Sequence, residues 1–264
     1  DRSHRGLGEG RIVREAAPEA AAAPSPAEAP PGAAAGGRGR GRGRGAIPPP
    51  VAYPDYPHPE ASAVSLHPGP GGGRIGGLAV DRTSHDATEK IIDNVDLAGP
   101  ALATADASEH RLLFATSELT APVHLSGTPR LTVRLASSKP AANLSVWLVV
   151  LPWADGPISP ANLITRGWAD PQNHGALDDG GDFHARERGA PLVPGRFYTL
   201  SFDLQPDDQI IPAGKRIGLM IFSSDRDFTL WPKPGTELTV DLGRTSLRLP
   251  VVGGAAAFNR AVGQ

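Results

Sequence analysis

The ten residues Thr165–His174, TRGWADPQNH, bring together an aromatic ring, two amides, an acid, a base and an imidazole. Side chains of these types serve acid–base catalysis, and they also satisfy loop backbone or reach a partner surface. Pro171 removes a ladder donor and restricts the residue before it, so we expect a strand to stop at Asp170. Trp168 offers a large apolar surface with a single donor, which suits a domain boundary.

Nucleophilic catalysis by serine is not indicated by the local sequence. A serine hydrolase of the α/β type carries its nucleophile on a tight strand-to-helix turn, where flanking glycines permit the strain in the pattern G-x-S-x-G. That pentapeptide does not occur in the sequence. The serine-rich segments 136–138 and 223–225 lack the glycines, and 223–225 is typical of a turn. We therefore assign no catalytic residue.

The acidic pairs do not predict a catalytic dyad. Asp178-Asp179 and Asp207-Asp208 are neighbours in sequence and would point to opposite sides of an extended chain. We interpret Asp207-Asp208 as a turn between strands, because the pair follows Pro206. Paired-acid hydrolysis needs two acids that converge on one substrate. A calcium site built from these acids stays open as an alternative, although EF-hand spacing is absent.

The histidines and the bulk composition point away from several kinds of site. The eight histidines lack H-x-H or H-E-x-x-H spacing, and His174 and His184 flank a Gly/Asp-rich loop, so we expect neither metal nor cofactor. There are 26 Lys and Arg against 28 Asp and Glu among the 264 residues, so we expect neither nucleic acid nor membrane as a partner. There is no cysteine, hence no disulfide and no thiolate nucleophile. We expect no signal peptide or membrane span, and the compartment stays open.

Composition divides the chain into three parts. Residues 1–52 are predicted to be a disordered, low-complexity segment rich in Ala, Pro, Gly and Arg, because such residues bury too little apolar area to offset their ordering entropy. The run GRGRGRGRG at 37–45 suggests RNA binding through arginine, but it has no interleaved aromatic residue, so a solvated linker is favoured. Residues 53–254 are predicted to be the folded domain, and 255–264 a tail.

Alternating apolar residues predict strands rather than helices. The segment 130–137, RLTVRLAS, places its leucines and valine on one face, while 143–153 is apolar on both faces over most of its length. The same period continues in 197–204, 217–223, 237–242 and 246–251, with Pro or Gly between the runs. We therefore expect an all-β fold, a jelly-roll-like antiparallel β-sandwich that is galactose-binding-like.

The segment 223–235, SSDRDFTLWPKPG, combines charge with apolar bulk. Asp225, Arg226 and Asp227 alternate in charge and are interpreted as a turn fixed by a salt bridge. Phe228, Leu230 and Trp231 then offer apolar bulk for either the sandwich core or a docking patch. Burial in the core is the favoured interpretation.

Three long phrases carry a resemblance to a known family: 112–153, from LLFATSELT to VVLPW; 165–174, TRGWADPQNH; and 191–242, from PLVPGRFYTL to ELTVDL. They closely resemble the C-terminal domain of Xaa-Pro dipeptidyl-peptidases, serine hydrolases grouped with cocaine esterase. The resemblance implies a jelly-roll sandwich and a family activity that releases N-terminal Xaa-Pro dipeptides. It also implies that the family's Ser, Asp and His belong to a separate α/β-hydrolase domain, so no triad residue is carried over and the chain alone is expected to be non-catalytic.

The resemblance assigns the two polar-aromatic segments a role at a domain boundary. An α/β-hydrolase domain, on a missing part or on a separate chain, is the expected partner, and a homo-oligomer is possible. The expected domain-interface residues are Trp168, Asp170, Gln172, Asn173, His174, Phe228 and Trp231. An exposed apolar patch is expected where the hydrolase domain would pack. The alternative is an independent carbohydrate- or peptide-binding jelly roll that uses tryptophans for stacking. Its candidates are Trp147, Trp153, Trp168 and Trp231.

Overall fold

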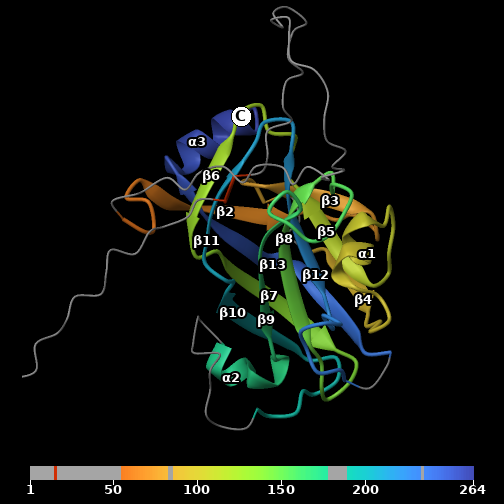
Figure 1. Cartoon of the computed structure of the whole chain (residues 1–264). Helices are drawn as coiled ribbons and strands as arrows, with labels where there is room; N and C mark the ends of the chain where they lie inside the picture. The colour runs from red at the N-terminus through yellow and green to blue at the C-terminus, as the bar shows by residue number, and fades with distance from the viewer. Residues whose placement is uncertain (1–14, 17–54, 83–85, 178–188, 233–234) are drawn as a thin grey trace, which may run out of the picture.

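The structure, a computed structural model, describes residues 15–16, 55–82, 86–177, 189–232 and 235–264 (Figure 1). Most of the expected low-complexity segment 1–52, including GRGRGRGRG, lies outside these residues, as do Asp178-Asp179 and His184. The strands are β1 (Glu15–Ala16), β2 (Ala61–Pro68), β3 (Ile75–Ala79), β4 (Thr88–Ile92), β5 (Arg111–Ala115), β6 (Val123–Gly127), β7 (Arg130–Ser137), β8 (Leu144–Leu151), β9 (Leu163–Ala169), β10 (Phe197–Asp203), β11 (Asp207–Ile211), β12 (Arg216–Phe222) and β13 (Glu237–Val252). The helices are α1 (Gly99–Thr104), the 3₁₀ turn η1 (Pro171–Asn173), α2 (His174–Leu177) and α3 (Gly254–Ala261).

The strands form two layers that face each other across one core (Figure 1). One layer contains β11, β6, β13, β7 and β10, with β2 and β4 also paired to β13. The other contains β3, β5, β12, β8 and β9, and pairing of β2 with β3 joins the two. The pairs are antiparallel apart from β3 with β5 and β1 with β11. The predicted all-β sandwich is confirmed.

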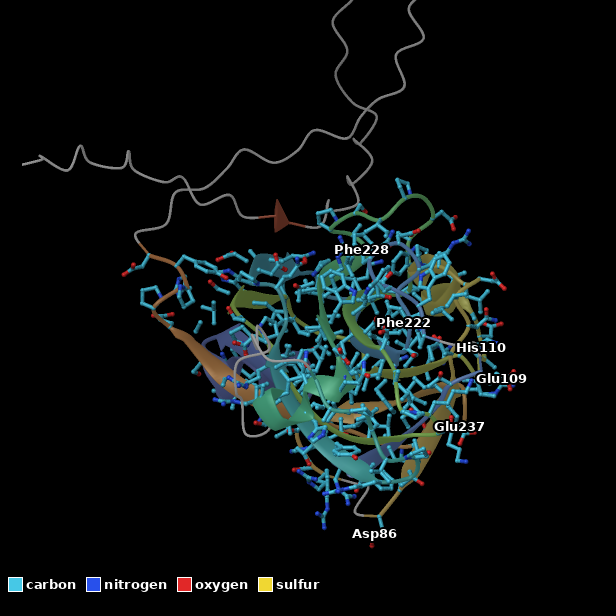
Figure 2. The ribbon with its side chains drawn as sticks, turned by 90° about the horizontal axis from the view of Figure 1, so that it is seen from below. Asp86, Glu109, His110, Phe222, Phe228 and Glu237 are labelled. Carbon is cyan, nitrogen blue, oxygen red and sulfur yellow. The ribbon has the colours of Figure 1, made fainter. Side chains whose placement is uncertain are left out.

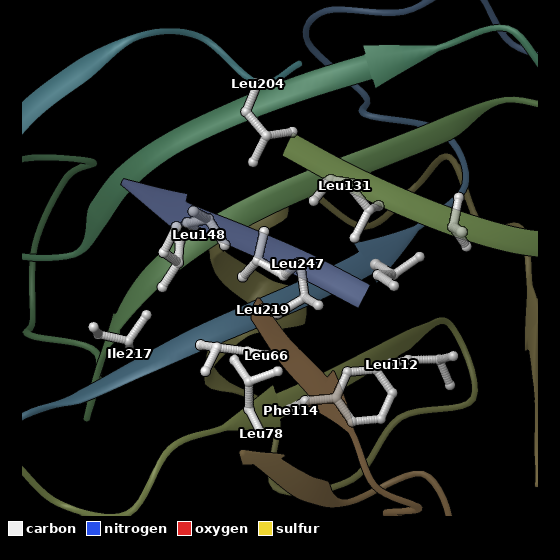
Figure 3. Close-up of a cluster of buried hydrophobic side chains, with 14 of the residues drawn as sticks. Leu66, Leu78, Leu112, Phe114, Leu131, Leu148, Leu204, Ile217, Leu219 and Leu247 are labelled. Carbon is white, nitrogen blue, oxygen red and sulfur yellow. The ribbon is translucent and has the colours of Figure 1, made fainter. Parts of the chain in front are cut away.

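Side chains from both layers fill the space between them (Figure 3). Leu131 on β7 and Leu247 on β13 meet Leu148 on β8 and Leu219 on β12, and all four side chains are fully buried. The alternation of β7 follows the predicted pattern, since its odd-numbered apolar residues enter the core and its intervening residues remain partly exposed. Strand β8 is buried at every position, as the apolar run on both of its faces predicted.

The structure differs from the sequence-based segments in three places. The segments 237–242 and 246–251 are one strand, β13, with a register shift between Asp241 and Ser246. Asp207-Asp208 is not a turn, because both residues belong to β11, which pairs with β6. Residues 255–264, expected as a tail, supply most of α3, which buries Phe258 and Ala261 against the main core.

A second apolar cluster lies outside the main core, where α1 covers β8 and β12. Leu102 and Ala103 of α1 pack there with Trp147 of β8 and Phe222 of β12. The rings of Trp147 and Phe222 meet edge to face, with their centroids 5.8 Å apart. The indole lies directly against Gly99, the first residue of α1, so this contact leaves no room for a Cβ atom.

Replacing Gly99 with alanine is expected to lower the free energy of unfolding by about 1–3 kcal/mol, because overpacking forces a well-packed core to shift. The added Cβ would lie 2.0 Å from Cη2 of Trp147, which is buried and cannot turn aside easily. Urea-induced unfolding measures the change. Gly175→Ala is the matched control, since nothing lies within 4 Å of its added Cβ. Equal stability of the two variants would contradict the packing argument.

Candidate functional site

The segment TRGWADPQNH forms the end of β9 and the turn that follows it. Strand β9 ends at Ala169, one residue before Asp170, as the Asp-Pro pair predicted. The Asp170 carboxylate then accepts a hydrogen bond from the backbone N–H of Gln172 at 2.8 Å, which caps η1. Pro171 occupies the first position of that turn, where a missing N–H costs nothing. The turn therefore fixes the polar side chains at the end of the sheet.

A groove of about 490 Å³ lies between this turn and the loop that follows β12. Ala141, Ala142 and Asn143 form part of its wall, just before β8 begins. Five of the seven predicted interface residues line it, and they come from two segments about sixty residues apart in sequence. They are Trp168, Asp170, Gln172, Asn173 and Trp231.

The two remaining predicted residues lie in different surroundings. Phe228 stacks on Trp168 beside the groove, with the ring centroids 5.5 Å apart. His174 faces away to a second, smaller hollow of about 230 Å³, where its ring lies 4.3 Å from that of Tyr198. The structure therefore does not bring His174 together with the other six residues.

Phe228, Leu230 and Trp231 are exposed rather than buried in the core. Their exposed fractions are 50%, 92% and 58%, so the favoured core interpretation is wrong for all three. Phe228 lies toward the margin of the sandwich, whereas Phe222 lies further inside (Figure 2). We call these three residues the apolar ridge. Apolar type alone indicates a preference for burial, but the described part of the chain leaves half or more of each of these residues exposed.

The ridge is held in place by a stacked arginine. The guanidinium of Arg166 lies 3.9 Å from the ring centroid of Phe228 and 5.4 Å from that of Trp168. Cation–π contacts of this kind are worth about 0.5–1 kcal/mol at exposed sites. Phe228, the first residue of the apolar ridge, is therefore stacked against Trp168 and Arg166. Leu230 and Trp231 follow it along the loop.

Asp225 does not make the predicted salt bridge. Its side chain is 1% exposed, and one carboxylate oxygen accepts hydrogen bonds from the indole N–H groups of Trp147, at 2.9 Å, and Trp168, at 3.0 Å. Its backbone oxygen accepts from the N–H groups of Phe228 and Thr229, both at 2.9 Å. Through these hydrogen bonds, the buried Asp225 connects Trp147 of the second apolar cluster, Trp168 of the groove, and the loop that carries the apolar ridge.

A further set of polar groups, buried at Asp93 and half-buried at Asn143, secures the same loop. The carboxylate of Asp93 accepts hydrogen bonds from the backbone N–H and the hydroxyl of Ser224, at 2.8 and 3.0 Å. The amide of Asn143 donates to the backbone oxygen of Leu230 and to the hydroxyl of Thr229. Buried acids that are fully engaged in this way act as structural supports, since leaving them unpaired is costly.

One serine, one histidine and one aspartate do meet in the sandwich, but in the wrong order for catalysis. Asp208 accepts from the Ser126 hydroxyl at 2.7 Å and lies 2.9 Å from Nε2 of His124. A triad requires the histidine between the serine and the acid, so that it can take the serine's proton. Here the acid lies between the other two, and Ser126 is fully buried. The cluster pins β6 to β11, and burial together with the neighbouring Asp207 and Asp208 raises the pKa of Tyr56 beside it.

The described residues offer neither a metal site nor a membrane-spanning helix. They contain no group of three or more His, Asp or Glu side chains able to hold a metal ion. No helix among them has the length and apolar character that crossing a membrane requires. Of the tryptophans considered for ligand stacking, Trp147 is 1% exposed and is not accessible to any ligand.

The fold occurs in larger solved hydrolases. An aminopeptidase from a marine sediment Thaumarchaeota archaeon has a TM-score of 0.56 at 17% identity, over 76% of this chain and 38% of that one. A CocE/NonD family hydrolase from Staphylococcus aureus has a TM-score of 0.57 at 12% identity, with the same coverage of both chains. At these identities the likeness shows the fold alone.

Sequence comparison gives the family. The family model of the X-Pro dipeptidyl-peptidase C-terminal non-catalytic domain matches residues 32–260. A Rhodopirellula baltica protein provisionally named Xaa-Pro dipeptidyl-peptidase is 54% identical over 207 residues, 78% of this chain and 32% of that protein. A Streptomyces avermitilis protein with the same provisional name is 31% identical over 79% of this chain and 35% of its own length. The chain thus spans about a third of these relatives, and it belongs to the X-Pro dipeptidyl-peptidase C-terminal non-catalytic domain family.

Proposed function

We propose that residues 53–254, with the helix α3 that follows them, are the accessory β-sandwich of a Xaa-Pro dipeptidyl-peptidase. The proposed partner is the α/β-hydrolase domain that carries the nucleophile, and the proposed contact is the groove together with the apolar ridge. The observation that carries this proposal is the exposure of Phe228, Leu230 and Trp231 in a member of a non-catalytic domain family. The sandwich would shape the peptidase and cover its active-site opening without performing a chemical step.

The groove has the make-up of a docking surface. Interfaces are built from aromatic and aliphatic anchors at the centre and a polar rim around them. Trp231 and Leu230 would supply the anchors, and Asp170, Gln172 and Asn173 would supply hydrogen bonds at the rim. The loop is already fixed by Asp225 and Asp93, so little conformational freedom would be lost when the partner docks.

A chimeric enzyme tests the proposal. In the Rhodopirellula baltica relative, the matched region is replaced by residues 55–264 of this chain, and hydrolysis of a chromogenic Ala-Pro amide is followed. The chimera is expected to retain activity that serine-directed inhibitors abolish. The double substitution Leu230→Asp, Trp231→Ser is expected to lower kcat/KM at least about tenfold, because the lost anchors are worth more than about 1.4 kcal/mol. Val193→Ser, which changes another exposed apolar residue, is the matched control and is expected to leave kcat/KM unchanged.

Two outcomes would count against this function. An unchanged kcat/KM in the double variant would remove the ridge from the domain contact. Steady turnover of the amide by this chain alone would mean that it carries its own nucleophile. For the carbohydrate- or peptide-binding alternative, the groove would be the proposed binding site, because the indoles of Trp168 and Trp231 line it. Saturable quenching of tryptophan fluorescence by polysaccharides would favour that alternative.

A further inference from the structure

A hollow larger than the groove lies at the opposite end of β8 from it. It has a volume of about 640 Å³, within the range of about 300–1,000 Å³ typical of small-molecule sites. Eight residues of strand β8 separate the two sites, a span of about 26 Å at about 3.3 Å per residue. We call it the α1 pocket, because the end of α1 forms one wall. Its lining residues include Arg74, Ile75, Asp106, Trp153, Asp155 and Arg216.

The walls of the α1 pocket are fixed by the buried side chain of Arg111. The guanidinium donates to the backbone oxygens of Leu102 and Ala105, on the α1 wall, at 3.1 and 2.6 Å. It also donates to the oxygens of Gly73 and Arg74, on the opposite wall, at 3.1 and 3.3 Å. The pocket is therefore formed before any ligand arrives, which lowers the ordering cost of binding.

The pocket presents both signs of charge without pairing them internally. Within the part of the chain that the structure describes, Arg74, Asp106 and Asp155 are exposed and their side chains make no hydrogen bond or ion pair. Arg216 donates from Nε to the backbone oxygen of Thr116 at 2.6 Å, which leaves its two terminal nitrogens for a ligand. Two guanidinium groups and two carboxylates thus line one hollow.

An apolar surface lies between these charges. Trp153 packs on Trp147 with the ring centroids 6.5 Å apart, and it remains partly exposed in the pocket. Ile75 is 42% exposed beside it. A flat indole next to an aliphatic side chain suits an apolar side chain or a saturated ring of about the size of proline.

We propose that the α1 pocket binds a short zwitterionic peptide. The carboxylate would bind to Arg74 and Arg216, the ammonium to Asp106 or Asp155, and an apolar side chain would lie on Trp153. A purely anionic or purely cationic ligand would meet one pair of unfavourable charges, whereas a zwitterion meets both pairs favourably. The choice of Ala-Pro as the probe rests on the proposed function; the charge pattern of the pocket does not.

Isothermal titration of the full chain with Ala-Pro tests this inference. Saturable binding is expected. N-acetyl-Ala-Pro-amide has the same side chains without either charge, and it is expected to bind at least about tenfold more weakly, since it forms no charge-assisted hydrogen bond. Arg74→Gln and Asp155→Asn are each expected to raise the Kd for Ala-Pro about tenfold. Arg248→Gln, an exposed arginine on β13 outside the pocket, is the matched control and is expected to leave the Kd unchanged.

The stability of the variants and the activity of the chimera distinguish the possible outcomes of the titration. The side chains of Arg74 and Asp155 make no hydrogen bond or ion pair within the described residues, so their variants are expected to unfold at the parent temperature, and a weaker titration would then report the pocket itself. Equal binding of the capped and free dipeptides, or no saturable heat with Ala-Pro, would overturn the inference. The titration uses residues 1–264 alone and does not depend on contact with a hydrolase domain, so an inactive chimera with normal Ala-Pro binding would count against the proposed function alone. An active chimera with no dipeptide binding would count against the pocket alone.

Discussion

Replacing Arg111 with alanine is expected to lower the free energy of unfolding by about 3–5 kcal/mol, because it removes a large buried side chain together with the donors to several backbone oxygens. The side chain is 0% exposed, and burial lowers its pKa. Its partners are four backbone oxygens, those of Gly73, Arg74, Leu102 and Ala105, and no ion pair with it is found among the described residues. The alanine variant would leave a cavity and remove a donor from all four carbonyl groups, of which Gly73 would keep the hydrogen bond from the Ser108 N–H.

Urea-induced unfolding monitored by circular dichroism measures this loss. Arg111→Lys is the informative companion, because it keeps the charge but offers its donors from one nitrogen instead of a planar fork. We expect lysine to fall between arginine and alanine. A free energy of unfolding of the alanine variant within about 1 kcal/mol of the parent value would be typical of ordinary substitutions. It would mean that the buried guanidinium does not fix the two walls of the α1 pocket.

Replacing Asp225 with alanine is expected to lower the free energy of unfolding by about 2–4 kcal/mol. The substitution leaves two indole N–H groups unpaired, and an unpaired buried donor costs about 1–3 kcal/mol. Trp147 is fully buried and Trp168 is partly buried, so water can replace the lost acceptor only at Trp168. Asp225→Asn keeps an oxygen acceptor in the same place, so it is expected to lower the free energy of unfolding by less.

Asp227→Ala is the matched control for this substitution. Asp227 lies two residues away in the same loop, is exposed, and makes no side-chain bond among the described residues. Its variant is expected to unfold within about 0.5 kcal/mol of the parent, as surface substitutions usually do. Near-ultraviolet circular dichroism adds a second measurement, since loss of Asp225 is expected to alter the tryptophan signal. Equal stability of the two alanine variants would contradict the role assigned to Asp225.

The strands could be predicted from the sequence because their periodicity is local. The odd-numbered apolar residues of β7 and the continuous apolar run of β8 each indicate a strand without reference to any other segment. Strand β11 escaped this reasoning because Asp207-Asp208 has the residue types of a turn. The partners that make a buried aspartate acceptable there, His124 and Ser126, lie more than eighty residues earlier in the chain.

The candidate site shows the same limit. The family resemblance predicted a boundary role for Trp168, Asp170 and Trp231, and the structure places all three in one groove. The charge pattern of 225–227 predicted a salt bridge, whereas Asp225 binds two indoles located 78 and 57 residues away. Apolar type likewise indicates that a ridge residue prefers burial, but it does not indicate whether this chain or another protein will bury it.

Strand β13 has a consequence for how the protein is made. It pairs with β7 along one edge and with β4 and β2 along the other, and it pairs with β6 near its end, yet it follows all the other described strands in sequence and is synthesised after them. Until β13 leaves the ribosome, its sheet lacks a central strand, and the apolar faces of the earlier strands are not fully buried. Such long-range pairing folds slowly and exposes nascent chains to aggregation. We therefore expect the nascent chain to depend on chaperones until β13 has left the ribosome.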